Sequence, residues 1–178
     1  MTDNTIRIAD YDPDWPLKFQ AEKARLLDVI EPYVAAIEHM GSTAVPGLAA
    51  KPVIDIMVCV RTLAEADAHC IEPIVALGYE YVPRFEDEMP FRRYFRKDNA
   101  AGRRSHQIHL VEIGGEFWER HLLFRDYLRA HPEAAREYEA LKSDLAPQFS
   151  NVNEYAEAKG VFVRSIEAKA RQWKSKPC

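Results

Sequence analysis

The spacing of apolar residues predicts a helix near the start of the chain. Asp14 is expected to cap this helix, Pro16 falls in its first turn, and Pro32 marks its end. A strand-like run over residues 33–40 follows, and it leads into a turn-rich segment, 41–47, that we expect to hold a short helix. The apolar stripe of the first helix consists of Phe19, Leu26, Leu27 and Ile30.

The strongest strand pattern lies at residues 53–60, which are β-branched or apolar on both faces apart from Asp55. Residues 62–77 are helical in pattern, and Pro73 predicts a kink or a division into two short helices. Gly78 is a typical helix stop. The strand patterns that follow cover residues 79–83, 91–97 and 105–113, and the last two are expected to form a hairpin.

The remaining sequence predicts helices over residues 116–130 and 133–145, and a final helix that begins at Asn151 or Asn153 and runs to about Trp173. This order of elements is typical of an α+β fold with a small mixed sheet, flanking helices and a C-terminal helical segment. The chain has 178 residues, which fits a single domain. We expect its core at about 14–113 and its C-terminal helices at about 116–173.

The composition is that of an ordinary globular protein, with 47% hydrophobic and 29% charged residues. A net charge of -4 disfavours general nucleic-acid binding, which needs clustered basic residues. Residues 1–9 lack the apolar region of a signal peptide, and no apolar run approaches membrane-spanning length. Together with three widely spaced cysteines, these features favour the cytoplasm as the compartment.

Basic residues gather around the predicted hairpin, where they would either bind an acidic ligand or form a solvated surface balanced by neighbouring acids. We favour the solvated surface, balanced by the acidic residues 86–88. The basic residues are Arg92, Arg93, Arg96, Lys97, Arg103 and Arg104.

The segment around Gly41 carries the candidate chemistry. Gly41 allows a ligand to approach the backbone closely, and the Ser42 and Thr43 hydroxyls, with the free amides of a short helix, are candidates for phosphate binding. Asp55 on the neighbouring strand is a candidate metal ligand, and Lys51 would neutralise further negative charge. The alternative is a tight turn beside a buried acid that the backbone satisfies.

The stretch from residue 37 to residue 56, IEHMGSTAVPGLAAKPVIDI, resembles the signature of GrpB proteins. Residues 106–111, 123–129, 138–142 and 155–159 fit the same family. The resemblance implies a nucleotidyltransferase-like core, in which a Gly-Ser turn holds the phosphates of a nucleoside triphosphate and strand carboxylates hold Mg²⁺. It is also the reason for including Arg125 and Lys159 among the candidate phosphate-binding residues.

One position departs from the pattern of that superfamily, which places two acids two residues apart on one strand. Here Asp55 is followed by Met57 on the same face, and methionine is a poor ligand for Mg²⁺. This counts against a two-metal mechanism. His109 on a later strand is our candidate for the missing ligand of Mg²⁺ or Mn²⁺, or for a catalytic base, while His106 is expected to face the opposite side of the strand.

Three functions fit these observations. The first is a metal-dependent nucleotidyltransferase-like protein that acts on an unknown small acceptor, with Asp55 and His109 as its catalytic residues. The second is a non-catalytic nucleotide-binding module that keeps the fold, which Met57 favours. The third is a protein-interaction role for the C-terminal helices, which predicts a large exposed apolar patch there.

Overall fold

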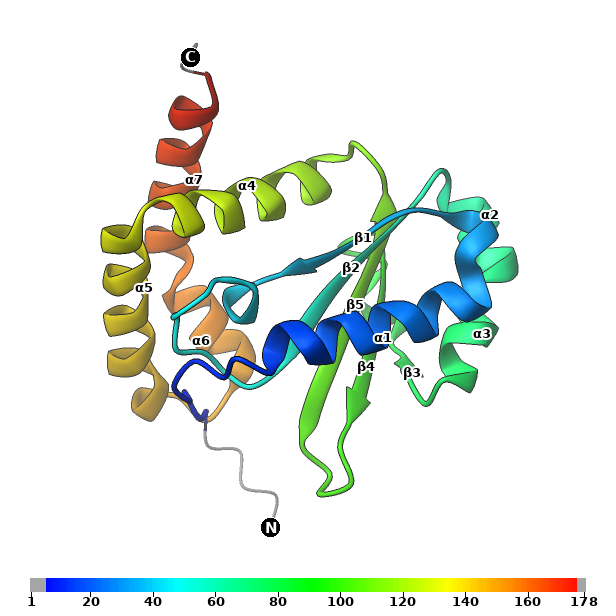
Figure 1. The fold of residues 1–178 in the computed structure, drawn as a ribbon, viewed down its shortest axis with the longest axis horizontal. Coiled ribbons are helices and arrows are strands. Elements are labelled where there is room, and N and C mark those ends of the chain that lie inside the picture. The colour runs from blue at the N-terminus through cyan, green and yellow to red at the C-terminus, as the bar shows by residue number, and fades with distance from the viewer. Residues whose placement is uncertain (1–5, 176–178) are drawn as a thin grey trace.

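The computed structural model describes residues 6–175, which contain one five-stranded mixed sheet (Figure 1). Its spatial order is β1-β2-β5-β4-β3, and the β2–β5 pair is parallel while the other pairs are antiparallel. The predicted α+β class, the mixed sheet and the hairpin are therefore confirmed. The strands are β1 (Val34–Met40), β2 (Ile54–Val60), β3 (Glu80–Tyr81), β4 (Arg92–Asp98) and β5 (Arg104–Glu112).

One face of the sheet is covered by α1 (Trp15–Ile30), α2 (Leu63–His69) and α3 (Ile71–Ala76). The predicted break near Pro73 is confirmed, because Pro73 lies in the first turn of α3 and cannot continue α2. The predicted cap of α1 is wrong in detail. The Asp14 side chain makes no capping hydrogen bond, and instead the Asp14 amide donates to the Asp12 carboxylate over 2.9 Å.

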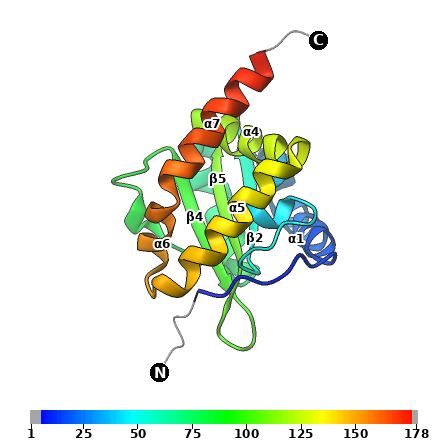
Figure 2. The same ribbon diagram turned by 90° about the vertical axis from the view of Figure 1, so that its left-hand side faces the viewer.

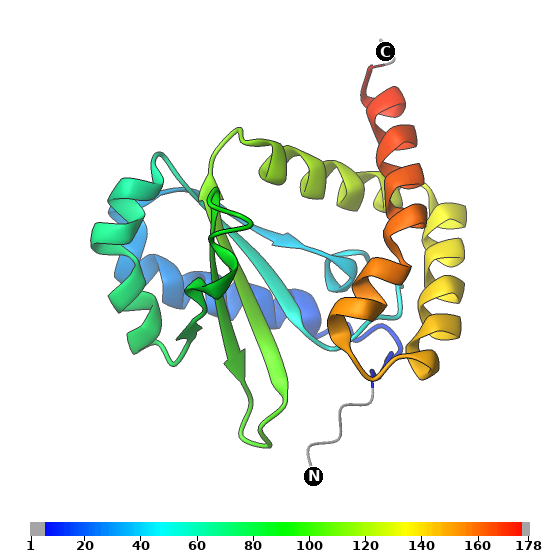
Figure 3. The same ribbon diagram turned by 180° about the vertical axis from the view of Figure 1, so that it is seen from behind.

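The C-terminal part contains α4 (Glu116–Ala130), α5 (Pro132–Leu145), α6 (Val152–Ala158) and α7 (Gly160–Ser175). The prediction of one long final helix is wrong, since α6 and α7 are separate helices and Gly160, a weak helix former, begins the second. Asn151 caps α6 by accepting a hydrogen bond from the Asn153 amide. The helix α4 leads from the sheet to α5 (Figure 3). The helices α5, α6 and α7 lie in front of β2, β5 and β4 in Figure 2 and to one side of the sheet in Figure 3.

Alternation along β2 decides which residues face these C-terminal helices. Ile54, Ile56 and Val58 enter the core beneath α1, so Asp55 and Met57 point to the opposite face. The register places Asp55 opposite Gln107 of β5. The segment between β1 and β2 is held to the helices by a second core, which contains Val45, Leu48, Tyr127, Leu128, Ala134, Tyr138, Ile166 and Ala170.

The surface features predicted for the hairpin and the C-terminal helices have different outcomes. Among residues 6–175, ion pairs involve four of the six hairpin bases, and Glu86 is the one partner from the expected acids 86–88. The other partners are elsewhere: Arg93 also pairs with Asp67, and Arg96 pairs with Glu80. The exposed large apolar side chains of α6 and α7 are spread along the two helices, at Val152, Val161 and Trp173, so they do not favour the interaction role. Within residues 6–175, no helix is both long enough and apolar enough to span a bilayer.

Candidate functional site

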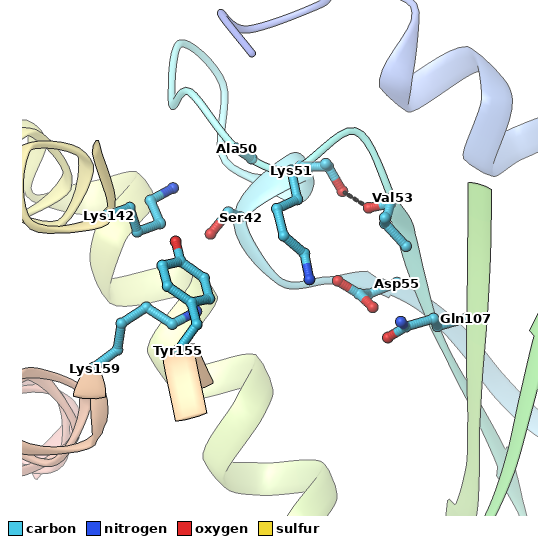
Figure 4. A pocket seen from close by; sticks show the side chains of 10 residues that line it. Ser42, Ala50, Lys51, Val53, Asp55, Gln107, Lys142, Tyr155 and Lys159 are labelled. Atoms are coloured by element: carbon cyan, nitrogen blue, oxygen red, sulfur yellow. Dashed lines mark hydrogen bonds between the residues drawn. The ribbon is translucent and has the colours of Figure 1, made fainter. Parts of the chain in front are cut away.

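A cavity of about 160 Å³ lies between the segment that joins β1 to β2, the strands β2 and β5, and the helices α5 and α6 (Figure 4). Three parts of the chain that are far apart in sequence therefore contribute side chains to one site, which we call the lysine pocket. It is lined by Ser42, Thr43, Ala50, Lys51, Val53, Asp55, Gln107, Lys142, Tyr155 and Lys159.

Asp55 points from β2 toward the Gly-Ser turn and is only partly buried. A β-carbon added to Gly41 would lie 2.7 Å from Oδ2 of Asp55, so the carboxylate contacts the turn backbone directly. Gly41 has a φ of 74° and a ψ of -171°, a conformation that side-chain-bearing residues rarely adopt. Burial raises the pKa of Asp55 to about 6, although the ammonium groups of Lys51 and Lys159 act in the opposite direction.

Three lysines line the pocket with a single carboxylate. Burial, followed by repulsion from Lys159, lowers the pKa of Lys142 to about 7. Burial and then repulsion from Lys51 lower the pKa of Lys159 to about 8, and burial also lowers the pKa of Lys51. The pocket therefore disfavours the charged form of its own cations, and a bound anion would reverse this effect.

Two hydrogen bonds connect α5 to the backbone of Ala49, in the segment between β1 and β2. The ammonium group of Lys142 donates a hydrogen bond to the carbonyl oxygen of Ala49, and the Ala49 amide donates to Glu139 over 2.8 Å. Lys142 is only 2% exposed. Lys159 follows directly after α6, and its ammonium group lies 4.2 Å from the centre of the Tyr155 ring on that helix, which is a favourable cation–π contact.

Most of the predicted phosphate-binding residues come together here. Ser42, Lys51 and Lys159 line the pocket beside Asp55, and Gly41 contacts the Asp55 carboxylate. Thr43 also reaches the pocket, but its hydroxyl donates to the Val53 carbonyl oxygen over 3.2 Å. That hydrogen bond fastens the turn to the start of β2, which gives Thr43 a structural task.

His109 does not line this pocket, because the β2–β5 register pairs it with Met57, two residues beyond Asp55. Its Nδ1 atom lies 3.2 Å from the Arg92 guanidinium, and its ring stacks on Phe117 with 5.5 Å between ring centres. Because arginine is always a donor, Nδ1 is the acceptor and the imidazole is neutral. Burial and then Arg92 lower the pKa of His109 well below its usual range.

Arg125 is also separated from the lysine pocket. It donates to Glu38 and to the carbonyl oxygen of His39, each over 2.8 Å, and pairs with Asp126. It lines a second cavity of about 330 Å³ beside α1 and β1, together with Arg129. These contacts place Arg125 in a structural ion-pair group with Glu38 and Asp126.

The residues of the pocket fit a divalent cation only in company with a ligand. In the part of the chain described, no group of three His, Cys, Asp or Glu side chains is placed to hold a metal ion. Asp55 is the carboxylate that lines the pocket, and Gln107 adds a carboxamide oxygen. Mg²⁺ is often bound by one or two carboxylates together with substrate phosphates and water, so this donor set is sufficient for one ion but not for two.

Five lining residues were absent from the predicted site, and three of them, Lys142, Tyr155 and Gln107, have polar side chains. Lys142 gave a usable signal, since it lies one turn from Tyr138 on the apolar face of its helix, where a lysine is unusual. Tyr155 gave none beyond its place in residues 155–159, which fit the family resemblance, because a buried tyrosine is ordinary core. Gln107 shares a strand with His109 and has the same side-chain direction, and only the pairing register selects Gln107 as the neighbour of Asp55.

Comparison with known proteins gives a consistent result along the chain. The sequence model of the GrpB protein family matches residues 5–169. The UPF0157 protein YqkA of Bacillus subtilis is 42% identical over 95% of this chain, which spans 48% of that protein, about half its length. The glutamate-rich protein GrpB of Alkalihalophilus pseudofirmus is 34% identical, and the match covers 90% of this chain and 93% of that protein.

A solved structure has the same fold. The crystal structure of conserved protein GrpB from Enterococcus faecalis superposes with a TM-score of 0.84 at 34% sequence identity. The superposition covers 96% of this chain and 100% of the other.

Proposed function

The chain belongs to the GrpB family, and from this membership and the lysine pocket we propose that it is a nucleotidyltransferase-like protein that binds a nucleoside triphosphate through its phosphates. The observation that carries the proposal is the concentration of Lys51, Lys142 and Lys159 around one cavity with Asp55 as its carboxylate. An acceptor for nucleotidyl transfer would be a small molecule of a class that the site does not specify.

The electrostatic balance of the pocket supports a strongly anionic ligand. Lysines are rarely buried without partners, and Lys142 and Lys159 carry pKa values of about 7 and 8. Two unit charges 4 Å apart attract each other by about 4 kcal/mol at an effective dielectric constant of 20, against about 0–1 kcal/mol for an exposed ion pair. A phosphate chain among these lysines would therefore gain more than the same chain at a solvated surface.

The size of the cavity supports phosphates as the enclosed part of the ligand. Cavities that enclose a whole drug-sized ligand usually measure roughly 300–1,000 Å³. The lysine pocket measures about 160 Å³, so it has room for phosphate groups while the base and sugar lie outside the enclosed part.

A divalent cation would be held by Asp55 and the Gln107 carboxamide together with the ligand's phosphates. Mg²⁺ or Mn²⁺ bound in this way would neutralise phosphate charge and polarise a phosphoryl oxygen. The protein's own contribution is positional: Lys51 stands beside Asp55, and Gly41 leaves the carboxylate close to the turn that would receive the phosphates.

The test is the melting temperature in the presence of ATP, GTP, CTP or UTP with Mg²⁺ or Mn²⁺. We expect at least one nucleotide to raise it, because a ligand that binds only the folded state stabilises that state. Lys159→Met should remove the shift, while Asp55→Asn should remove its metal-dependent part. Lys169→Met, on the exposed face of α7, is the matched control and should keep the full shift. No shift with any of the four nucleotides under either metal would contradict the proposal.

A second candidate is nucleotide binding without turnover, and Met57 favours it. Its side chain is fully buried beside Asp55, where the nucleotidyltransferase pattern has a second acid. This candidate predicts that the nucleotide-induced shift is the same with and without a divalent cation. Release of pyrophosphate from the bound nucleotide would exclude it.

A further inference from the structure

A second cavity, of about 330 Å³, lies at the outer edge of β1, and we call it the edge cavity. β1 is the first strand in the sheet order and pairs only with β2 among the described strands, and Figure 1 shows it between α1 and α4. The volume is within the range of about 300–1,000 Å³ that is usual for small-molecule sites. No described residue lines both this cavity and the lysine pocket, so the two are separate.

Basic side chains are fixed along the edge cavity by the backbone of β1. The ammonium group of Lys23 donates to the carbonyl oxygen of Ile37 over 3.2 Å. Arg125 donates to the carbonyl oxygen of His39 over 2.8 Å. These hydrogen bonds cover the edge of the strand, and they hold two cations in place before any ligand binds.

The charges around the edge cavity are not balanced. Arg125 is neutralised by the carboxylates of Glu38 and Asp126, each 2.8 Å away. Arg129 lies 3.7 Å from Asp126, which Arg125 already holds, and Lys23 has no carboxylate partner within residues 6–175. Three cations therefore face two carboxylates, which leaves an excess of one positive charge.

Two pKa values agree with this imbalance. Burial, followed by repulsion from Arg125, lowers the pKa of Arg129. Burial, then Arg129 and Arg125, lower the pKa of His39 to about 4, so the imidazole that lines the cavity is neutral and adds no charge at pH 7. An anion in the edge cavity would relieve the repulsion between the two arginines.

Apolar side chains make up much of the remaining lining. Pro16 in the first turn of α1 and Pro46 in the segment between β1 and β2 are exposed, whereas Phe19 and Ile37 are buried. A rigid proline ring loses almost no conformational freedom when it contacts a ligand. The edge cavity therefore offers an apolar surface together with unbalanced cations.

We infer that the edge cavity is a second ligand site, which takes a small organic carboxylate with an apolar body. The carboxylate would bind Arg129, whose side chain is 40% exposed and so open to a ligand, and Lys23 would add to the attraction. The apolar body would lie against Pro16 and Pro46. This inference goes beyond the proposed function and does not depend on it.

The size of the excess charge favours a carboxylate over a phosphate. A carboxylate carries one negative charge, which is the charge that the edge cavity lacks. A phosphate monoester carries about 1.5–2 negative charges at neutral pH and would leave the cavity negative. The planar guanidinium group of Arg129 also matches the two oxygens of a carboxylate.

Three probes that share one ring and differ in charge test the inference: benzoate, uncharged benzamide and phenyl phosphate. Each is titrated into the isotope-labelled protein, and NMR follows the backbone amide signals of the cavity residues and the Nε signals of the arginines. We expect benzoate to shift these signals and to bind at least about tenfold more tightly than benzamide, as for a hydrogen bond to a charged group. Phenyl phosphate should bind more weakly than benzoate.

Arg129→Gln removes the guanidinium charge from a side chain that is partly exposed, and thermal unfolding checks that the variant folds. It should weaken benzoate binding by about tenfold or more. Lys23→Gln is a second variant, and it should weaken the binding by a smaller factor. The matched control is Arg136→Gln, which changes an exposed arginine of α5 outside both cavities and should leave benzoate binding unchanged.

Equal affinities for benzoate and benzamide would overturn the inference, and so would unchanged benzoate binding in Arg129→Gln. Signal shifts confined to residues outside the edge cavity would overturn it as well. Tighter binding of phenyl phosphate than of benzoate would contradict the carboxylate class. Nucleotide binding in the lysine pocket is measured separately with Lys159→Met, so either proposal can fail while the other stands.

Discussion

The carboxylate of Asp55 fills the space that a side chain at position 41 would need. Oδ2 of Asp55 lies 2.7 Å from the place of a β-carbon on Gly41, closer than such a carbon tolerates. Glycine is therefore required at position 41 for two reasons, its φ of 74° and this close contact with Asp55. The close approach brings the acid of β2 against the backbone of the turn where the lysine pocket begins.

Gly41→Ala should consequently destabilise the protein by more than the backbone strain alone, which is about 1–3 kcal/mol for a residue forced into such a conformation. Gly102→Ala is the matched control, because Gly102 has a φ of 69° and nothing within 4 Å of an added β-carbon. Urea unfolding of the two variants isolates the cost of displacing Asp55. Equal losses of unfolding free energy would show that the carboxylate moves aside freely.

The low pKa of Lys142 predicts a pH dependence of stability. Its pKa is about 7 in the folded protein and 10.5 ordinarily, so the unfolded state binds more protons between these values. This group therefore makes the unfolding free energy rise with pH, by about 2 kcal/mol between about pH 7 and pH 9. In Lys142→Met that part of the rise should disappear, as measured by urea unfolding at both pH values. An unchanged slope would mean that the folded lysine keeps its ordinary pKa.

Binding of a polyphosphate should have the opposite dependence on alkaline pH. A bound anion favours the charged forms of Lys142 and Lys159, so binding takes up protons and weakens as pH rises above about 7–8. The metal-dependent part should also weaken below about pH 6, where Asp55 becomes protonated and loses its value as a ligand. Calorimetric titration of one nucleotide with Mn²⁺ across this range measures both limits. Lys142→Met should flatten the alkaline limit, and Asp55→Asn should remove the acidic one.

His109→Gln tests which residue accompanies Asp55 as a metal ligand. The sequence predicted His109, whereas the fold places Gln107 opposite Asp55. His109 lies beside Met57 and Arg92, so the substitution should leave the metal-dependent shift in melting temperature intact. Gln107→Leu should reduce that shift, because Gln107 lies opposite Asp55 and lines the pocket. Loss of the shift in His109→Gln alone would restore His109 as the second ligand.

Local sequence patterns predicted most of the helices and strands and one wall of the lysine pocket. The helix over Glu116–Ala130 and the break near Pro73 follow from spacing and from proline chemistry. The Gly41-Ser42 turn and Asp55 were predicted together because a turn and the strand that returns beside it lie close in sequence. Gly160, in contrast, interrupts a helical pattern so briefly that the division into α6 and α7 was missed.

The opposite wall depends on contacts that no local pattern encodes. Lys142 and Tyr155 line the same pocket as Asp55 because the helices α4, α5 and α7 pack on Val45 and Leu48, an association of segments far apart in the chain. Whether Gln107 or His109 lies opposite Asp55 depends on a shift of two residues in strand register. Such a shift leaves the side-chain direction unchanged, so the alternation of apolar and polar residues along the strand cannot reveal it. Alternation along a strand tells which face a residue occupies, whereas hydrogen bonding along the whole strand pair determines which residue stands opposite it.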